Sequence, residues 1–359
     1  MKKKAQSLLQ ELTEAHAVSG YEEEVREIFV NELTGIGELS ADKMGGVYCE
    51  TGSDGPSIML AGHMDEVGFR VKHITPGGFL KIVAVGGWWT HTLLSQRVEV
   101  KTQSGNKVLG VISSVSPHHL SPAERSKVLD IAHLFIDIGA SSQADTIQNF
   151  GISLGDPIAP AVPFSALGKP DHYLAKAFDN RVGMACVIQS LQELAQTALP
   201  NQLTGVGTVQ EEVGLRGASV AARKVQPDVA IILEGPPADD SPGFNPAESQ
   251  GALGAGVQIR IQDPTALMNP RLVALVERVA QENQIPYQIT VRDSGGTDAG
   301  NIHKENLGIP SVVLGTPARY IHSHNAMINL NDYLAMVQLS TALVKALDQE
   351  TVDGLTKYL

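Results

Sequence analysis

Short β-prone runs alternate with longer amphipathic segments over most of this chain, and no other feature constrains the fold as strongly. The β-prone runs are Ser57–Leu60, Gly205–Val209, Val229–Leu233, Gln288–Val291 and Ser311–Leu314. The amphipathic segments are Asn180–Gln196, Leu215–Arg223, Pro270–Glu282 and Leu330–Leu347. Strands and helices in turn indicate a parallel sheet covered by helices. We therefore predict an α/β fold, a three-layer α/β/α sandwich with a mostly parallel central sheet.

The middle of the chain lacks this alternation. Short strand-like runs recur there between turns that contain Gly, Pro and Ser, and they are Phe69–Ile74, Phe79–Val85, Arg97–Thr102 and Lys107–Ser114. One helix-like stretch lies near Gln143–Phe150. This pattern is typical of antiparallel β structure. We expect a small antiparallel β domain over residues 69–167, inserted into a catalytic α/β domain made of residues 1–68 and 168–359.

Helix signals mark the start of the chain. Leu8, Leu9, Leu12 and Ala15 recur at helical spacing. Ser19 and Glu22 then have the spacing of a capping box ahead of a helix that runs to about Leu33.

Composition excludes several functions. The 359 residues carry 27 Lys and Arg against 39 Asp and Glu, a net charge of −12. Such an acidic chain is unsuited to nonspecific nucleic-acid binding or to an anionic membrane surface, and no apolar run is long enough to span a bilayer. Cys49 and Cys186 are the only cysteines and form no Cys-x-x-Cys motif. A reducing, cytoplasmic location is the simplest setting for such a chain.

Chemically distinctive residues follow several of the strand-like runs. His63 and Asp65 stand two apart in extended chain, so both side chains point to one side. This arrangement suits a metal-binding imidazole that is oriented by a carboxylate, although a lone His-x-Asp is more often incidental. Asp179 precedes an amphipathic segment and taken alone is most simply a helix N-cap.

Further acids and a histidine complete the set. Glu211 and Glu212 come directly after one β-prone run, Glu234 ends another, and His322 lies in Arg319–His324. Adjacent acids repel each other when buried, unless a cation compensates their charge. Ligands gather at the carboxyl ends of strands in open α/β sheets, so these side chains are expected to converge. Nitrogen and oxygen ligands without thiolates suit zinc, cobalt or manganese, and the number of acids favours two ions.

On these residues the chain resembles the glutamyl aminopeptidases and tetrahedral (TET) aminopeptidases, which are two-metal metallopeptidases. The resemblance runs nearly end to end. Its most specific motifs are His63-Met64-Asp65-Glu66-Val67-Gly68-Phe69, Gln210-Glu211-Glu212-Val213-Gly214-Leu215-Arg216-Gly217, Gly295-Gly296-Thr297-Asp298-Ala299-Gly300 and Arg319-Tyr320-Ile321-His322-Ser323. We expect the glycines of the third motif to form a tight turn near the substrate, with Asp298 capping a helix.

The resemblance implies a role for each site residue. His63, Asp179 and Glu234 would hold one divalent ion, and Asp179, Glu212 and His322 the other. Asp65 would orient His63, and Glu211 would be the general base. Where this chain has Glu234 the family usually has Asp, so the carboxylate is kept on a side chain one methylene longer. Two ions per subunit are implied, zinc foremost, with cobalt or manganese as alternatives.

The resemblance also implies a reaction and an assembly. The chain would remove the N-terminal residue of peptides through a hydroxide that bridges the two ions, with a preference for acidic residues. The inserted domain would mediate dimers that build a dodecamer. Trp88 and Trp89 would be interface anchors or, alternatively, cap the small β core.

The residues alone are also compatible with two other functions. One is a two-metal amidohydrolase or carboxypeptidase that acts on N-acylated substrates, and the other is a catalytically silent scaffold. The longest gap between ligands separates His63 from Asp179, where the insert lies. In the carboxypeptidase and deacylase relatives the extra domain enters later, so the spacing favours the aminopeptidases.

Overall fold

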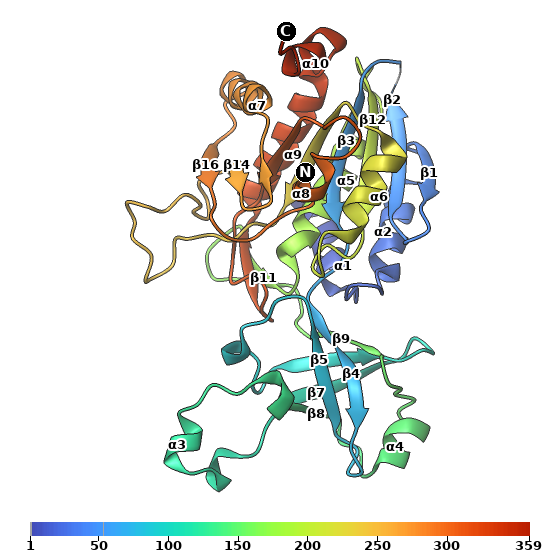
Figure 1. The fold of residues 1–359 in the computed structure, drawn as a ribbon, viewed down its shortest axis with the longest axis vertical. Coiled ribbons are helices and arrows are strands. Elements are labelled where there is room, and N and C mark those ends of the chain that lie inside the picture. Colours follow the sequence, from blue (N-terminus) through green and yellow to red (C-terminus); the bar gives the residue numbers. More distant parts are fainter. Residues whose placement is uncertain (1, 53) are drawn as a thin grey trace.

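The computed structural model describes residues 2–52 and 54–359, which form an α/β body and a β barrel (Figure 1). The body fills the upper part of the view and the barrel the lower part. None of the helices in the described part of the chain is both long and apolar enough to span a membrane.

A nine-stranded sheet forms the centre of the body. The strand order is β1-β2-β12-β3-β13-β17-β14-β15, and β16 pairs with β14. The strands are β1 (Glu38–Ala41), β2 (Val47–Gly52), β3 (Ser57–His63), β12 (Gln202–Thr208), β13 (Val229–Glu234), β14 (Val257–Asp263), β15 (Ala266–Leu267), β16 (Tyr287–Val291) and β17 (Ser311–Gly315). The central strands β12, β3, β13 and β17 are parallel, whereas antiparallel pairs occur at both margins. The carboxyl ends of these central strands therefore lie at one edge.

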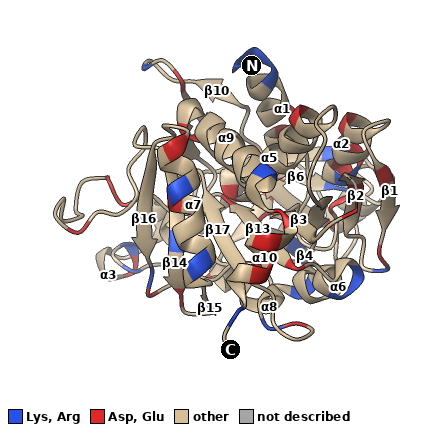
Figure 2. Cartoon of the chain, turned by 90° about the horizontal axis from the view of Figure 1, so that it is seen from above, with Lys and Arg blue, Asp and Glu red and all other residues tan. Residues whose placement is uncertain are grey.

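Helices cover both faces of the sheet. The helices are α1 (Lys2–Glu14), α2 (Glu23–Leu33), α5 (Phe178–Leu194), α6 (Arg216–Val225), α7 (Pro270–Glu282), α8 (Ala299–Ile302), α9 (Leu330–Ala346) and α10 (Gln349–Leu355). Helices α1, α5 and α9 pack on one face, and α6 and α8 pack on the other (Figure 2). Because α5 lies between the sheet and other helices, nearly all of its residues are buried. Two covered faces explain why β3 and β13 are almost wholly apolar.

The middle of the chain forms a closed barrel in the order β4-β5-β8-β7-β6-β9. Its strands are β4 (Gly68–Ile74), β5 (Leu80–Val85), β6 (Arg97–Lys101), β7 (Lys107–Ser113), β8 (Phe135–Asp137) and β9 (Pro157–Pro160). The connections carry the short helices η1 (Thr90–Thr92), η2 (Pro117–His119), α3 (Pro122–Arg125), η3 (Ile131–His133) and α4 (Gln143–Gln148). All strand pairs of the barrel are antiparallel. Its apolar core is separate from the core of the body.

A small antiparallel sheet joins distant segments beside the central sheet. Its strands, in the order β10-β11-β19-β18, are β10 (Ser165–Ala166), β11 (His172–Ala175), β18 (Ala318–Arg319) and β19 (Ala326–Asn329). Since β11 and β18 both pair with β19, the segments that follow them are held near each other.

The predicted fold class is confirmed. The predicted segment Pro270–Glu282 matches α7 at both ends, and the predicted β-prone runs fall within β3, β12, β13, β16 and β17 apart from single terminal residues. Trp88 stacks on Phe69 of the barrel with ring centroids 4.8 Å apart, whereas Trp89 is 66% exposed. Trp88 therefore caps the small core and Trp89 does not.

The predicted capping box is wrong. The N-cap of α2 is Glu22, and no side chain caps this helix. The Ser19 hydroxyl donates instead to Asp65, at 2.6 Å. The Glu22 carboxylate accepts from the backbone N–H groups of Gly20 and Gln210. Both side chains serve contacts between distant segments, because the loop before α2 packs against the carboxyl edge of the sheet.

Candidate active site

Three parallel strands end at one group of side chains. His63 is the last residue of β3 and Glu234 is the last residue of β13. Glu211 and Glu212 follow the end of β12, which lies on the other side of β3. Because neighbouring parallel strands end at the same edge, these four side chains meet there.

The small antiparallel sheet supplies two more residues. Asp179 follows β11 and His322 follows β18. Asp179 and Asn180 have non-helical backbone angles, so the regular turns of α5 begin after them. Asp179 is thus held at the edge of the sheet by β11 on one side and α5 on the other.

Asp179 lies between two imidazoles. Its Oδ1 is 3.2 Å from His63 Nε2, and its Oδ2 is 3.3 Å from His322 Nε2. His322 Nε2 is also 3.3 Å from Glu212 Oε2. Each carboxylate oxygen of Asp179 therefore faces a different imidazole, a geometry that suits a carboxylate shared by two cations.

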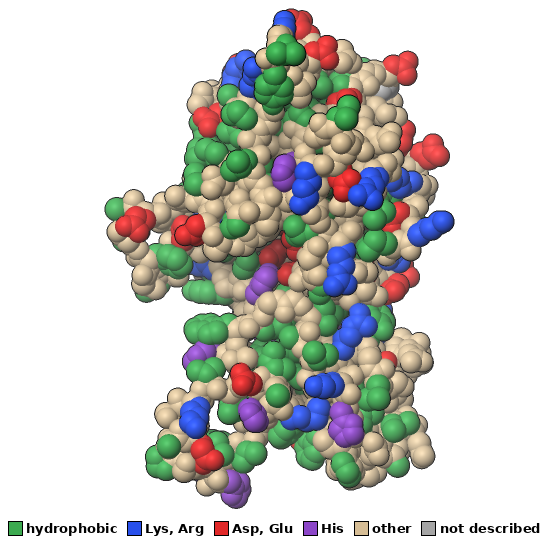
Figure 3. All heavy atoms as spheres, viewed as in Figure 1, with side chains coloured by type: hydrophobic (Ala, Val, Ile, Leu, Met, Phe, Trp, Pro, Cys, Tyr) green, Lys and Arg blue, Asp and Glu red, His purple; other side chains and the backbone are tan. Residues whose placement is uncertain are grey.

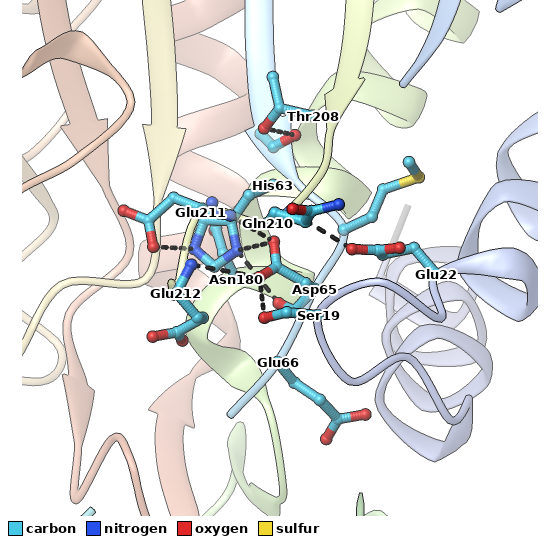
Figure 4. A network of polar contacts seen from close by, with 12 residues as sticks. Ser19, Glu22, His63, Asp65, Glu66, Asn180, Thr208, Gln210, Glu211 and Glu212 are labelled. Carbon is cyan, nitrogen blue, oxygen red and sulfur yellow. Dashed lines mark hydrogen bonds and ion pairs between the residues drawn. The ribbon is translucent and has the colours of Figure 1, made fainter. Parts of the chain in front are cut away.

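Asp65 lies beside His63 and contacts the residues that form the site (Figure 4). Its carboxylate is buried and lies 3.5 Å from His63 Nδ1. It accepts from the backbone N–H groups of Glu211 at 2.9 Å and of Glu212 at 3.1 Å. The Ser19 hydroxyl donates a further hydrogen bond to this carboxylate. The backbone oxygen of Asp65 also lies 3.1 Å from His63 Nδ1, so this one residue fixes both the ring of His63 and the start of the Glu211–Glu212 segment.

Glu211 and Glu234 face the same nitrogen of His63. Each has an Oε2 atom 3.8 Å from His63 Nε2, and both side chains are largely buried. Burial raises the pKa of Glu234 to about 8 and raises the pKa of Glu211 well above its usual range. Burial lowers the pKa of His322, but contacts with Asp179 and Glu212 outweigh it and raise that pKa to about 11.

These residues fit divalent cations. Glu212 Oε1 and Glu234 Oε1 are buried without a hydrogen-bond partner in the described part of the chain. Unpaired buried carboxylate oxygens are costly, and a cation would satisfy them. Two sets of ligand atoms lie within 4.8 Å of one another: His63, Asp179 and Glu212, and His63, Glu211 and Glu234. Glu211, expected to act as a base, is thus also close enough to serve as a ligand.

One buried acid beside the site was misassigned from the sequence. Asp298 stands at the N-cap of α8, but its side chain makes no capping bond, so the helix-capping prediction is wrong. Its Oδ2 accepts from the hydroxyl of Thr208, the last residue of β12. Burial raises the pKa of Asp298 to about 6. The sequence does contain a signal for this contact: Thr208 is a polar residue at the end of a buried strand and therefore needs a hydrogen-bond partner.

A cleft of about 1250 Å³ opens onto the site. Figure 3 shows acidic side chains at the bottom of a hollow near the middle of this face. Arg260 and Arg292 are also among the lining residues. Arg260 is only 5% exposed and pairs with Asp263 at 3.0 Å, while its Nε is buried without a partner among the described residues. Neither Arg260 nor the strand β14 that carries it was predicted from the sequence.

Imidazole and carboxylate side chains that meet at the carboxyl edge of an open α/β sheet are typical of hydrolases that use divalent ions. A family model described as M42 glutamyl aminopeptidase matches residues 45–339. The chain belongs to this family.

Relatives and solved structures agree with this assignment. The chain is 38% identical to the putative aminopeptidase FrvX of Escherichia coli, with 98% of each chain covered. It is 35% identical to the glutamyl aminopeptidase of Lactococcus lactis, with 97% of this chain and 98% of the relative covered.

The solved structures are similar over the full length. A TET aminopeptidase from a Thaumarchaeota archaeon of marine sediment superposes with a TM-score of 0.95 at 41% identity, with 99% of each chain covered. The Pyrococcus horikoshii TET1 peptidase, described as assembling into a tetrahedron or a large octahedral shell, has a TM-score of 0.86 at 31% identity over 96% of this chain and 100% of its own. The predicted family and the predicted aminopeptidase activity are confirmed.

Proposed function

We propose that this aminopeptidase works with two divalent ions held by the converging side chains. His63, Asp179 and Glu234 hold one ion, and Asp179, Glu212 and His322 hold the other. The main support is the position of Asp179, whose two oxygens face the two histidines separately. The departure at Glu234 is accommodated, since its Oε2 still reaches within 3.8 Å of His63 Nε2.

Glu211 is the proposed general base. Bound ions would lower the pKa of a water molecule and polarise the scissile carbonyl. The Glu211 carboxylate would take a proton from that water, and the resulting hydroxide would add to the scissile carbonyl carbon. Glu211 would then return the proton to the amine nitrogen as the C–N bond breaks. Its position favours this role, because the Glu211 side chain lines the cleft and its Oε2 lies 3.8 Å from His63 Nε2. Asp65 acts through His63 and the backbone of Glu211, holding both in place.

Zinc is the proposed ion, with cobalt or manganese as alternatives. Imidazole and carboxylate ligands without thiolates suit all three. Dialysis against a chelator should abolish activity, and the ion that restores it at the lowest concentration identifies the preferred metal.

The substrate is a peptide with a free N-terminus, and we propose a preference for an acidic first residue. The acids on the floor of the cleft are suited to a cationic α-amine. Arg260 provides the contrasting charge in the wall, with an unpaired buried Nε. The positive charge of its guanidinium, which lines the cleft, would attract a carboxylate on the substrate side chain.

A panel of amino-acyl p-nitroanilides, each beside its N-acetyl form, tests the function. Cleavage of the free-amine forms alone, fastest for Glu and Asp, is the expected result. Cleavage of the blocked forms would instead identify an amidohydrolase or carboxypeptidase. No cleavage of either form by protein that retains its metal would identify a catalytically silent scaffold.

The barrel is proposed as a dimerisation domain over residues 69–167, inserted into a catalytic domain of residues 1–68 and 168–359. Trp89, Leu109 and Val111 support this role, because all three are exposed apolar side chains of the barrel. We propose a homo-oligomer, with dimers assembling into a dodecamer. A cytoplasmic location is proposed because Cys49 and Cys186 are both buried free thiols.

A further inference from the structure

Three charged side chains lie buried behind the proposed metal site. Glu66, Lys176 and Arg181 are each at most 4% exposed. Glu66 Oε1 accepts from Lys176 Nζ at 2.6 Å and from Arg181 Nη2 at 3.0 Å. Glu66 Oε2 accepts from Lys176 Nζ at 2.7 Å. We call these three residues the buried triad.

The buried triad connects two segments that carry proposed metal ligands. Glu66 lies three residues after His63, and Arg181 also donates to the carbonyl of Met64, the residue next to His63. Lys176 and Arg181 lie on either side of Asp179 in the chain. The triad is therefore a direct link between the segment that bears His63 and the segment that bears Asp179.

The same side chains fasten both segments to the N-terminal region. Arg181 Nε donates to the carbonyl of Leu12 at 3.0 Å, and Lys176 Nζ donates to the carbonyl of Ala15 at 2.7 Å. The backbone N–H of Ala17 donates to Glu66 Oε1 at 3.1 Å. The end of α1 and the turn after it thus lie against the rear of the site.

Stability alone is a poor explanation for such a cluster. Removing three charges from water is costly, and their mutual attraction often fails to exceed that cost. Apolar residues of similar size would fill the same space without it. A fully hydrogen-bonded buried network does, however, fix the relative positions of the segments that it joins.

We propose that the buried triad is a positioning device that sets the distance between His63 and Asp179, and so the affinity of the metal held between them. Its members are positioning residues, since none of them contacts the cleft. This inference rests on the proposed metal site. The new element is that the affinity for the ion depends on the buried triad, although none of its three residues is a proposed metal ligand.

The test uses Glu66→Gln and the double variant Glu66→Gln/Lys176→Met. The double variant removes one negative and one positive charge, so the net charge of the triad is unchanged. It therefore replaces the single variant in the test if the single variant fails to fold. Metal-free protein is titrated with Zn²⁺ by calorimetry, and the absorption spectrum of the Co²⁺ form reports ligand geometry. Displacement of His63 relative to Asp179 should weaken Zn²⁺ binding by up to about 10- to 100-fold, the loss that follows removal of a hydrogen-bond partner from a metal ligand. The Co²⁺ spectrum should shift and kcat should fall.

Tyr333→Phe is the matched control. It removes a buried hydrogen bond of 2.8 Å to Gln189, which is also on α5 but away from the ligands. This variant should lose thermal stability while binding Zn²⁺ as the wild type does. Unchanged Zn²⁺ affinity in the folded double variant would overturn the inference, as would an equal loss in Tyr333→Phe. Wild-type protein that binds no divalent ion would instead overturn the proposed function itself.

Discussion

The backbone N–H of Glu211 donates to Asp65 Oδ1 at 2.9 Å, which ties the proposed base to the carboxylate that supports His63. The position of Glu211 thus depends on its backbone and leaves its side chain free to exchange a proton. The side chain can therefore be changed without loss of this tie.

Glu211→Gln should lower kcat by about 10²- to 10⁴-fold, because glutamine cannot accept the proton from water. Two ions per chain should remain, as measured by elemental analysis of the dialysed protein. Glu248→Gln, which changes another carboxylate of the cleft lining, is the control and should leave kcat near the wild-type value. A loss of metal in Glu211→Gln would show that Glu211 is a ligand, in line with its proximity to His63 and Glu234.

Arg260→Gln should change specificity. The ratio of kcat/KM for a Glu substrate to that for a Leu substrate should fall by about 10- to 100-fold, since a hydrogen bond to a charged group contributes about 1.5–3 kcal/mol. Asp263 keeps donors from Thr265 and Ala266 after the change, so the fold should survive. Arg271→Gln on α7, whose guanidinium donates to two backbone carbonyls near the C-terminus and lies over the ring of Tyr358, should leave the ratio unchanged. An unchanged ratio in Arg260→Gln would assign specificity elsewhere.

His16 should make the protein less stable in mild acid. Its ring is buried without a hydrogen-bond partner in the described part of the chain, and burial lowers its pKa from 6.5 to about 4. The unfolded chain therefore takes up the proton first. The contribution of His16 is intact above pH 6.5 and is lost as the pH falls to about 4, by about 3 kcal/mol in total.

Urea denaturation of metal-free protein measures this effect. His16→Leu should show a weaker loss of unfolding free energy between pH 6.5 and pH 4 than the wild type does. Parallel pH profiles for the two proteins would mean that other groups dominate the acid sensitivity.

Trp89→Ser should weaken assembly. Trp89 is 66% exposed on the barrel, and an aromatic side chain at the centre of an interface contributes about 2 kcal/mol or more. Light scattering should show a smaller average mass at low protein concentration than for the wild type. Leu307→Ser removes an exposed apolar side chain from the body and should leave the mass unchanged. Equal masses for all three proteins would place the interface elsewhere.

The main features of the fold could be predicted because the strands of the sheet are compact apolar runs. β3 and β13 are buried on both faces, so their sequences carry little besides apolar residues, and His63 and Glu234 at their carboxyl ends stand out. β14 was missed because Gln258 and Arg260 interrupt it, although both are buried in the folded protein. Arg260 was missed for the same reason.

Side-chain partners were harder to predict than elements. Ser19 and Glu22 have the spacing of a capping box, and Asp298 precedes a helix, but each side chain bonds to a segment distant in sequence. Local spacing is the same whether a polar side chain turns back to its own helix or reaches another element. The packing of the loop before α2 against the edge of the sheet decides the outcome for Ser19 and Glu22, and the packing of Asp298 against the end of β12 decides it for Asp298.

The barrel begins on β4 and ends on β9, and these strands pair at Phe69 and Ile158. The two crossings between barrel and body therefore lie next to each other, and the barrel keeps a core of its own. Residues can be gained, lost or exchanged at the far end of the barrel without moving His63 relative to Asp179. Evolution can accordingly remodel the outer surface of the barrel and the chemistry of the catalytic centre as two nearly independent traits.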